Sequence, residues 1–367
     1  MTDTSISWTD KTWNVTRGCR RVSPGCENCY AERQANRFAG PGGAYEGLIK
    51  RTASGPPHTV TARWNGETRF AVDHLADPLR WRKPCRIFVD SMSDLFYEGF
   101  TNEQIAAVFG VMAACPQHTF QVLTKRARRM REWFEWVASA PVPFDGLPVY
   151  PDYVRQRQVC CRHAWMLPDS EARVARREPY GLHPSDDVLE FQRGQWPPPN
   201  VWLGVSVEDQ ERADERIPEL LRTPAAVRFL SCEPLLSTVD LWAHLWEPAD
   251  RDGTCQPHNR FRVRPDAIDW VIVGCESGPG ARPCDVAWLR SLRDQCAAAG
   301  VAFFLKQARG PERNGIGGSR HMVPIARVRD GSFGAVTADD GSRAKGGGVI
   351  ELPYLDGVQH AAFPKVR

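Results

Sequence analysis

Residues 201–209 of the chain read Val-Trp-Leu-Gly-Val-Ser-Val-Glu-Asp, an apolar run that ends in polar side chains. A short run that is apolar at almost every position is typical of a strand buried on both faces of a sheet. Serine and aspartate often begin helices, because their side chains accept hydrogen bonds from free backbone amides there. The stretch therefore predicts a buried parallel strand that leads into a helix.

Six other segments have the same character, and helical patterns separate several of them. The seven predicted strands are residues 12–16, 86–90, 119–123, 201–205, 227–230, 270–273 and 302–305. Strands that alternate with helices predict βα units around a parallel sheet. We therefore expect an α/β fold of the TIM type: a (β/α) barrel, complete or partial, over residues 1–309 with inserted lid segments.

Helix signals accompany these strands. Thr101 and Gln104 have the spacing of a capping box ahead of an apolar helical face. Asp285 can cap a helix that Gly300 ends, and residues 31–38 form a helical pattern after the first cysteines. The residues that interrupt the alternation are expected to be insertions at 40–84 and 137–199 and a partly irregular C-terminal extension over 310–367.

The composition limits the class of protein. Hydrophobic residues make up 42% and charged residues 25%, which is typical of a globular chain, and the net charge is only +3. No apolar run approaches the roughly 18 residues that span a bilayer, and the N-terminal residues carry no secretory pattern. Twelve cysteines then indicate a reducing compartment, so we expect a cytoplasmic protein without disulfides and without a membrane partner.

The strongest chemical signal is a loop with three cysteines, Cys19, Cys26 and Cys29. Pro24 and Gly25 allow a sharp turn, so the thiols can converge on one centre that suits zinc or an iron–sulfur cluster. A structural zinc takes four ligands as two close pairs, but no second pair or histidine follows nearby. A [4Fe–4S] cluster ordinarily takes four cysteines, so three of them leave one iron open to another ligand.

Polar side chains also gather where six of the predicted strands end. These segments are residues 90–94, 124–126, 206–209, 231–233, 274–277 and 306–307. In a parallel barrel the carboxyl ends of the strands form one rim, and that rim holds the active site. Each segment alone is equally consistent with a helix cap, but the set indicates a site.

Several segments carry a resemblance that extends from Ser7 to Gln307. They are GC(x6)GCENCYAER, VDSMSDLF, VLTKRARR, VWLGVSVEDQERADERIPELL, FLSCEPLL, DWVIVGCESGPGARP and FFLKQ. With them the chain resembles a phage and prophage protein family of unknown function that has a three-cysteine motif. That family is similar to radical S-adenosylmethionine enzymes and, more distantly, to the spore photoproduct lyase branch.

The resemblance implies a cofactor site. It implies a [4Fe–4S] cluster on the three thiols, with S-adenosylmethionine on the open iron. Ser91 and Asp94 are then expected near the amino group of the cofactor, and Ser206 and Glu208 near its ribose, with the alternative that Glu208 caps a helix. Two further rim residues expected to bind the cofactor are Glu276 and Ser277.

Other rim residues are candidates for chemistry or for substrate binding. The catalytic candidates are Cys232, Glu233 and Lys306. The substrate-binding candidates are Lys125, Arg126 and Arg128, which suit a phosphate or carboxylate, with a solvated basic face as the alternative.

A second, fainter thiol group lies in the insertions. Cys160, Cys161 and His163, together with Cys255 and His258, could form a zinc site that joins two loops. Five further cysteines are expected to be small buried hydrophobes, namely Cys85, Cys115, Cys232, Cys284 and Cys296, of which Cys232 is the one placed for chemistry.

These features predict a radical S-adenosylmethionine enzyme in a bacterial or phage-infected cell, with an electron-donor protein as partner. Basic clusters and thirteen tryptophans favour a nucleic acid (DNA or RNA) or a nucleotide as substrate, because aromatic rings stack on bases. One alternative is a nucleic-acid-binding or processing protein with a structural cluster or zinc and no radical step. The other is an accessory subunit of a partner enzyme.

Overall fold

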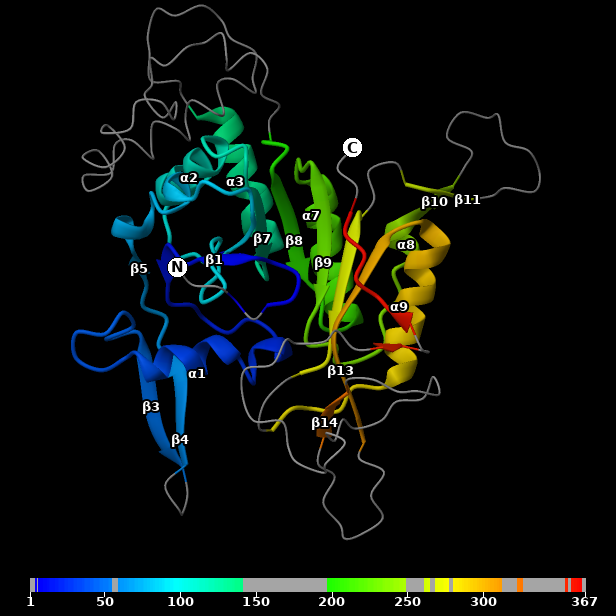
Figure 1. Cartoon of the computed structure of the whole chain (residues 1–367), viewed down its shortest axis with the longest axis horizontal. Helices are drawn as coiled ribbons and strands as arrows, with labels where there is room; N and C mark the ends of the chain where they lie inside the picture. Colours follow the sequence, from blue (N-terminus) through cyan, green and yellow to red (C-terminus); the bar gives the residue numbers. More distant parts are fainter. Residues whose placement is uncertain are drawn as a thin grey trace, which may run out of the picture. The chain divides into compact units, whose positions relative to one another are not determined.

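The structure is a computed structural model of the whole chain (Figure 1). It describes residues 4, 6–54, 59–140, 197–248, 261–264, 268–276, 280–311, 322–325, 354–355 and 358–364. The chain divides into two compact units. The first comprises Met1–Thr4, Thr9–Gly204 and Arg222–Ala226, and the second comprises Ser5–Trp8, Val205–Leu221 and Val227–Arg367. None of the helices described is long and apolar enough to cross a membrane.

The first unit is built on strands in the hydrogen-bonded order β1-β6-β7-β8. Their bounds are β1 (Lys11–Trp13), β6 (Arg86–Val89), β7 (Thr119–Thr124) and β8 (Val201–Ser206), whose last two residues belong to the second unit. β1 pairs with β6 and β6 with β7 in parallel. Every residue of β8 is buried, as its apolar sequence predicts.

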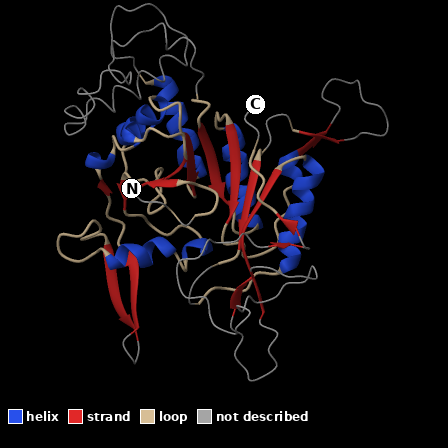
Figure 2. Ribbon diagram, in the orientation of Figure 1, coloured by secondary structure: helices blue, strands red, loops and turns tan. Residues whose placement is uncertain are grey.

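Helices α2 (Asn102–Ala113) and α3 (Ala127–Ser139) follow β6 and β7 along the chain. Figure 2 draws them in blue with the other helices. The predicted capping box is present, because Thr101 accepts from the amide of Gln104 and the Gln104 side chain accepts from the amide of Thr101. The two helices share an aromatic core in which the Phe109 and Trp133 ring centres lie 4.4 Å apart. Burial of these large rings stabilises the packing of the two helices.

The segment between β1 and β6 holds the cysteines and a hairpin. Its elements are β2 (Thr16–Arg17), η1 (Pro24–Cys26), α1 (Tyr30–Arg37), β3 (Ile49–Ser54), β4 (Thr59–Trp64), β5 (Arg69–Phe70), η2 (Val72–His74) and η3 (Pro78–Arg80). β3 and β4 pair in antiparallel fashion, and β2 pairs with β5. The expected insertion at 40–84 thus contains an ordered hairpin beside α1 (Figure 1).

The second unit begins with the end of β8 and holds strands in the order β9-β12-β13-β14. These strands are β9 (Val227–Cys232), β12 (Trp270–Gly274), β13 (Ala302–Pro311) and β14 (Met322–Ile325), of which the first three are parallel and β14 is antiparallel to β13. The other elements are α7 (Gln210–Arg222), α8 (Trp242–Leu245), β10 (Trp246–Pro248), β11 (Phe261–Val263), α9 (Val286–Ala299), β15 (Tyr354–Leu355) and β16 (Val358–Gln359).

Trp270 on β12 is the centre of this unit's core. Its ring packs against the rings of Trp8, Phe229, Phe304 and Phe363. Its indole nitrogen donates to the carbonyl of Ala362 at 2.8 Å, so the one polar atom of the ring is satisfied. Among the described residues, the tryptophans that are almost fully buried are Trp8, Trp13, Trp133 and Trp270, and these serve packing rather than base stacking.

The sequence predictions for the fold are confirmed at the level of class. Strands form at all seven expected places, although the first ends at Trp13 and Thr16 belongs to β2. The predicted helices at residues 31–38, after Thr101 and from Asp285 to Gly300 are present. Gly300 ends α9 with a left-handed φ of 69°. Parallel strands with helices give a mixed α/β fold, whereas closure into a barrel stays a prediction. Most of the expected insertion at 137–199 and of the extension over 310–367 lies outside the described residues.

Asp90, directly after β6, is a buried acid with unusual backbone geometry. Its φ is 57°, and its Oδ1 accepts from the Thr16 amide at 2.9 Å. Its Oδ2 is buried and has no hydrogen-bond partner among the described residues. Burial raises the pKa of Asp90 to about 7, although the Thr16 amide lowers it. The neutral acid is therefore the form that the folded chain favours below that pH.

This pKa predicts a pH-dependent stability. Between pH 4 and 7 the unfolded chain releases the Asp90 proton and the folded chain keeps it. The contribution of Asp90 to the free energy of unfolding therefore falls as pH rises. The variant Asp90→Asn mimics the neutral acid, and asparagine also tolerates positive φ. Relative to wild type, Asp90→Asn should become more stable as pH rises, by up to about 4 kcal/mol at pH 7. Urea unfolding at several pH values measures this, with exposed Asp73→Asn as control; a constant difference would contradict it.

Candidate functional site

The cysteine loop begins at Gly18, immediately after β2. Gly18 has a φ of 90°, and a Cβ there would lie 2.1 Å from the carbonyl oxygen of Glu67. The Gly18 carbonyl accepts from the Ser93 hydroxyl at 2.6 Å, which fixes the start of the loop to the segment after β6. Only glycine permits this close approach in a left-handed conformation. The position of Cys19 therefore depends on its neighbour having no side chain.

The three thiols occupy different positions along the loop. All three are free, and each is half-buried. Cys26 ends η1, and its Sγ lies 3.8 Å from the Ser23 hydroxyl. Cys29 is the N-cap residue of α1, where the backbone amides and the helix dipole favour a negative charge. The loop thus presents one sulfur at a helix N-terminus and two ahead of it.

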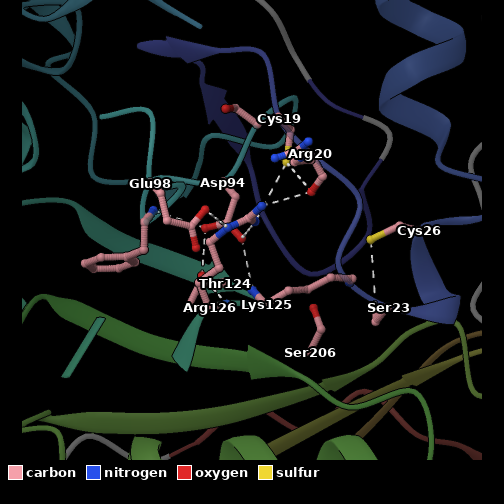
Figure 3. Close-up of polar contacts among 12 residues, drawn as sticks. Cys19, Arg20, Ser23, Cys26, Asp94, Glu98, Thr124, Lys125, Arg126 and Ser206 are labelled. Carbon is pink, nitrogen blue, oxygen red and sulfur yellow. Dashed lines mark hydrogen bonds and ion pairs between the residues drawn. The ribbon is translucent and has the colours of Figure 1, made fainter. Parts of the chain in front are cut away.

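Arg126, at the start of α3, lies beside Cys19 (Figure 3). Its Nη1 is 3.9 Å from the Cys19 Sγ and 2.9 Å from Asp94 Oδ2. Its Nη2 donates to the Arg20 carbonyl at 2.9 Å, and its Nε donates to Glu98 at 3.0 Å. With a side chain only 4% exposed, the guanidinium is a buried cation that binds the cysteine loop to the ends of β6 and β7.

Two more groups complete this arrangement. The Arg126 guanidinium lies 4.7 Å from the centre of the Tyr97 ring, a cation–π contact. Asp94 accepts four hydrogen bonds, because Phe96 N and Thr124 Oγ1 donate to Oδ1 while Lys125 N and Arg126 Nη1 donate to Oδ2. Asp94 is therefore saturated by its own neighbours, and its role in the structure is to orient Arg126.

Charge and burial act on the thiols in opposite directions. Burial and the Asp94 carboxylate raise the pKa of Cys19 to about 12, although Arg126 lowers it. Burial raises the pKa of Cys29, against backbone hydrogen bonds from Glu32 and Ala31 that lower it. Both thiols are protonated at neutral pH in the metal-free chain, so binding of a metal would release protons.

The three thiols are soft donors of the kind that bind zinc or an iron–sulfur cluster. Among the described residues, no group of three His, Cys, Asp or Glu side chains is arranged around one ion position. The thiols still lie near enough for the charges of Cys26 and Cys29 to affect Cys19. Which metal centre the loop holds stays a prediction.

The second unit has a separate polar group at its strand ends. Lys306 Nζ on β13 lies 3.0 Å from Glu233 Oε1 after β9, and the Ser231 hydroxyl donates to Glu233 Oε2 at 3.4 Å. A Cβ on Gly274, at the end of β12, would lie 2.5 Å from Glu233 Oε1. The carboxylate therefore rests against a backbone without a side chain. Cys232 is fully buried and burial raises its pKa, which is typical of an inert thiol.

The other expected cofactor residues in this unit are engaged in ion pairs. Glu208 is fully buried and pairs with Arg216 at 2.9 Å, and Arg216 also donates to the Ser206 carbonyl. Both oxygens of Glu276 accept from Arg282. These contacts hold the loops after β8 and β12 in place.

The remaining predicted residues are dispersed. The Ser91 hydroxyl donates to Asn14 at 3.1 Å. Lys125 follows β7, and its amide binds Asp94. Arg128 is exposed on α3 and pairs with Glu132 at 2.8 Å, so it does not join the Arg126 group. Ser277 and the expected zinc ligands Cys160, Cys161, His163, Cys255 and His258 lie outside the described residues.

Sequence reasoning missed three groups that the fold brings to the cysteine loop. Glu98 and the Arg20 carbonyl bind Arg126, and Glu32 is a buried acid that accepts from Arg21 Nε at 3.1 Å. Glu32 lies within the cysteine motif, three residues after Cys29, and that position was the available signal. The sequence carries no such signal for Glu98, because its contact with Arg126 depends on how the loop after β6 folds.

The fold and the site together define an α/β protein with a three-thiol loop braced by a buried arginine. The chain belongs to a family described as a protein of unknown function (DUF5131), which matches residues 3–363. Searches of curated proteins and of solved structures found no significant match. The phage context and the relationship to radical enzymes remain expectations from the sequence.

The geometry of Gly18 predicts a specific stability cost. Gly18→Ala adds a Cβ that clashes with the Glu67 carbonyl as well as backbone strain, whereas Gly42→Ala meets only the strain of its φ of 73°. We expect Gly42→Ala to lower the free energy of unfolding by about 1 kcal/mol and Gly18→Ala by at least about 1 kcal/mol more. Urea unfolding measures both, and equal losses would show that the close approach to Glu67 is unimportant.

Proposed function

We propose that the protein is an iron–sulfur enzyme of the radical S-adenosylmethionine type that acts on a nucleic acid or nucleotide. The observation that carries the proposal is the three-thiol loop, in which a buried guanidinium lies 3.9 Å from the Cys19 sulfur. Cys19, Cys26 and Cys29 would hold three irons of a [4Fe–4S] cluster, and the fourth iron would bind the amino-acid end of S-adenosylmethionine.

Two features beside the thiols would offset part of the negative charge of a bound cluster. Three thiolates around a cluster carry more negative charge than a buried site tolerates without partners. Arg126 supplies a permanent positive charge beside Cys19, and the N-terminus of α1 favours the thiolate of Cys29. Arg126 itself is fixed by Asp94 and Glu98, so its charge stays in place without reorganisation.

The proposed chemistry belongs mainly to the cofactor. Held by Cys19, Cys26 and Cys29, a reduced cluster would supply the one-electron chemistry for reductive cleavage of S-adenosylmethionine and hydrogen abstraction from a substrate. The protein's part is to position the cluster and exclude water. Asp94 contributes by orienting Arg126, because its own oxygens are saturated.

In the second unit, Glu233 and Lys306 are the proposed groups for substrate binding or proton transfer. They form a 3.0 Å ion pair at the ends of parallel strands, where α/β proteins place their ligands. The lysine is partly exposed, so it can also contact an anionic substrate such as a phosphate.

A structural cluster or zinc in a nucleic-acid-binding protein is the second candidate. One observation favours it: Arg126 pairs with Asp94 and donates to the Arg20 carbonyl of the cysteine loop, as expected of a structural brace. The two candidates differ in whether the bound centre cleaves S-adenosylmethionine.

Anaerobic reconstitution separates the candidates. We expect about four irons per chain, a visible absorbance typical of iron–sulfur proteins and, after reduction with dithionite, release of 5′-deoxyadenosine from S-adenosylmethionine. A cluster without 5′-deoxyadenosine supports the structural candidate. Tightly bound zinc without iron contradicts the proposed enzyme and supports the zinc form of the second candidate.

Matched cysteine variants locate the centre. Cys29→Ala should abolish iron binding, because only two ligands remain in the loop. Cys115→Ala, at a fully buried cysteine elsewhere in the first unit, should keep full iron content and lose only stability. Full iron content in Cys29→Ala would show that the cluster is not held by this loop.

A further inference from the structure

The β3–β4 hairpin carries two like charges directly opposite each other. Lys50 on β3 and Arg63 on β4 are paired in the antiparallel register, so their side chains share one face. Both are exposed, and neither makes an ion pair in the part of the chain that the structure describes. Like charges in this position destabilise a sheet, so the fold alone gives no reason for the pair.

The two faces of the hairpin differ in what they contact. Ile49 and Trp64 lie on the face that packs against a small core around Ala35, and from the same face Arg51 reaches Asn36 of α1. Lys50 and Arg63 alternate with these residues and therefore point away from α1. The opposite pair Thr52 and Thr61 lies on this outer face and is also exposed. We call Lys50, Thr52, Thr61 and Arg63 the outer ribbon face.

The charge around the outer ribbon face is one-sided. From Ile49 to Trp64 the chain has three basic residues, Lys50, Arg51 and Arg63, and no acidic one. Arg51 reaches Asn36 from the other face, so Lys50 and Arg63 are the cations of the outer ribbon face. The hairpin thus presents cations and hydroxyl groups to solvent with little competing negative charge. Lysine, arginine and threonine side chains are the groups that contact nucleic-acid phosphates.

The hairpin is also fixed to the cysteine loop. Glu32 accepts from Arg21 Nε in the loop and from the backbone amide of Trp64 in β4, both at 3.1 Å. Cys29 caps α1, and α1 packs on the hairpin. A ligand bound to the outer ribbon face is therefore held by a hairpin that packs on α1, the helix that begins directly after Cys29.

We propose that the outer ribbon face binds the sugar–phosphate backbone of a nucleic acid. Charge complementarity selects this partner, and two-stranded ribbons are an established way to present side chains to nucleic acids. The inference deepens the proposed function, on which it rests, by naming the nucleic acid rather than a free nucleotide as substrate. Binding at this face requires neither iron nor S-adenosylmethionine.

The test measures binding of a fluorescein-labelled DNA of about 20 nucleotides, single-stranded and as a duplex, by fluorescence anisotropy. Lys50→Glu with Arg63→Glu should weaken binding at least about tenfold at low salt and reduce the salt dependence by about two phosphate contacts. Arg82→Glu with Lys83→Glu makes the same charge change at exposed residues that precede β6, the opposite end of the strand from the cysteine loop, and should change binding less than about twofold.

A single variant separates binding from folding. Lys50→Glu places an acid opposite Arg63, which should keep or raise the melting temperature while it weakens DNA binding. Equal effects of the two double variants, or no effect of the ribbon variant, would overturn the inference. Binding is measured on Cys29→Ala as well: intact binding without a cluster leaves this inference standing whatever becomes of the radical chemistry, whereas a cluster with no DNA binding overturns this inference alone.

Discussion

The buried ion pair between Asp94 and Arg126 is the interaction on which the cysteine loop depends. A buried pair costs desolvation energy that its own attraction rarely repays, so it needs further hydrogen bonds. Here Asp94 accepts from two backbone amides and a threonine, and Arg126 donates to Glu98 and to the Arg20 carbonyl. The pair therefore converts the ends of two strands into a fixed support for a loop that has little regular structure of its own.

Glu32 has a corresponding role on the other side of the loop. It is 2% exposed and binds Arg21 and the Trp64 amide, so the cysteine loop, α1 and the β3–β4 hairpin meet at one carboxylate. Arg126 and Glu32 act on the same loop with opposite charges, the first at Cys19 and the second beyond Cys29. A loop held from both sides has less freedom to lose, which would lower the ordering cost of any metal that binds there.

The parts of the fold that are local in the sequence could be predicted. Near-continuous apolar runs identified the seven strands, and the Thr101 and Asp285 caps identified helix starts, because these signals depend on neighbours within four residues. For the site, the sequence predicted which residue types take part but not which of them contact one another. Arg126 was expected to bind substrate, but it is buried against Asp94, 32 positions away. Such contacts depend on which strand ends become neighbours, and no local pattern encodes that.

Each unit has a glycine at a strand end where an added side chain would clash with a close neighbour. After β2, Gly18 lets the backbone pass so near the Glu67 carbonyl that a Cβ would lie 2.1 Å from its oxygen, and at the end of β12, Gly274 makes room for the Glu233 carboxylate. A methyl group at either position would force its neighbour to move, because closely packed interiors leave no room for an added side chain. The cysteine loop and the Glu233 carboxylate therefore each depend on a position without a side chain, whereas the exposed Lys50 and Arg63 of the hairpin are under no such constraint.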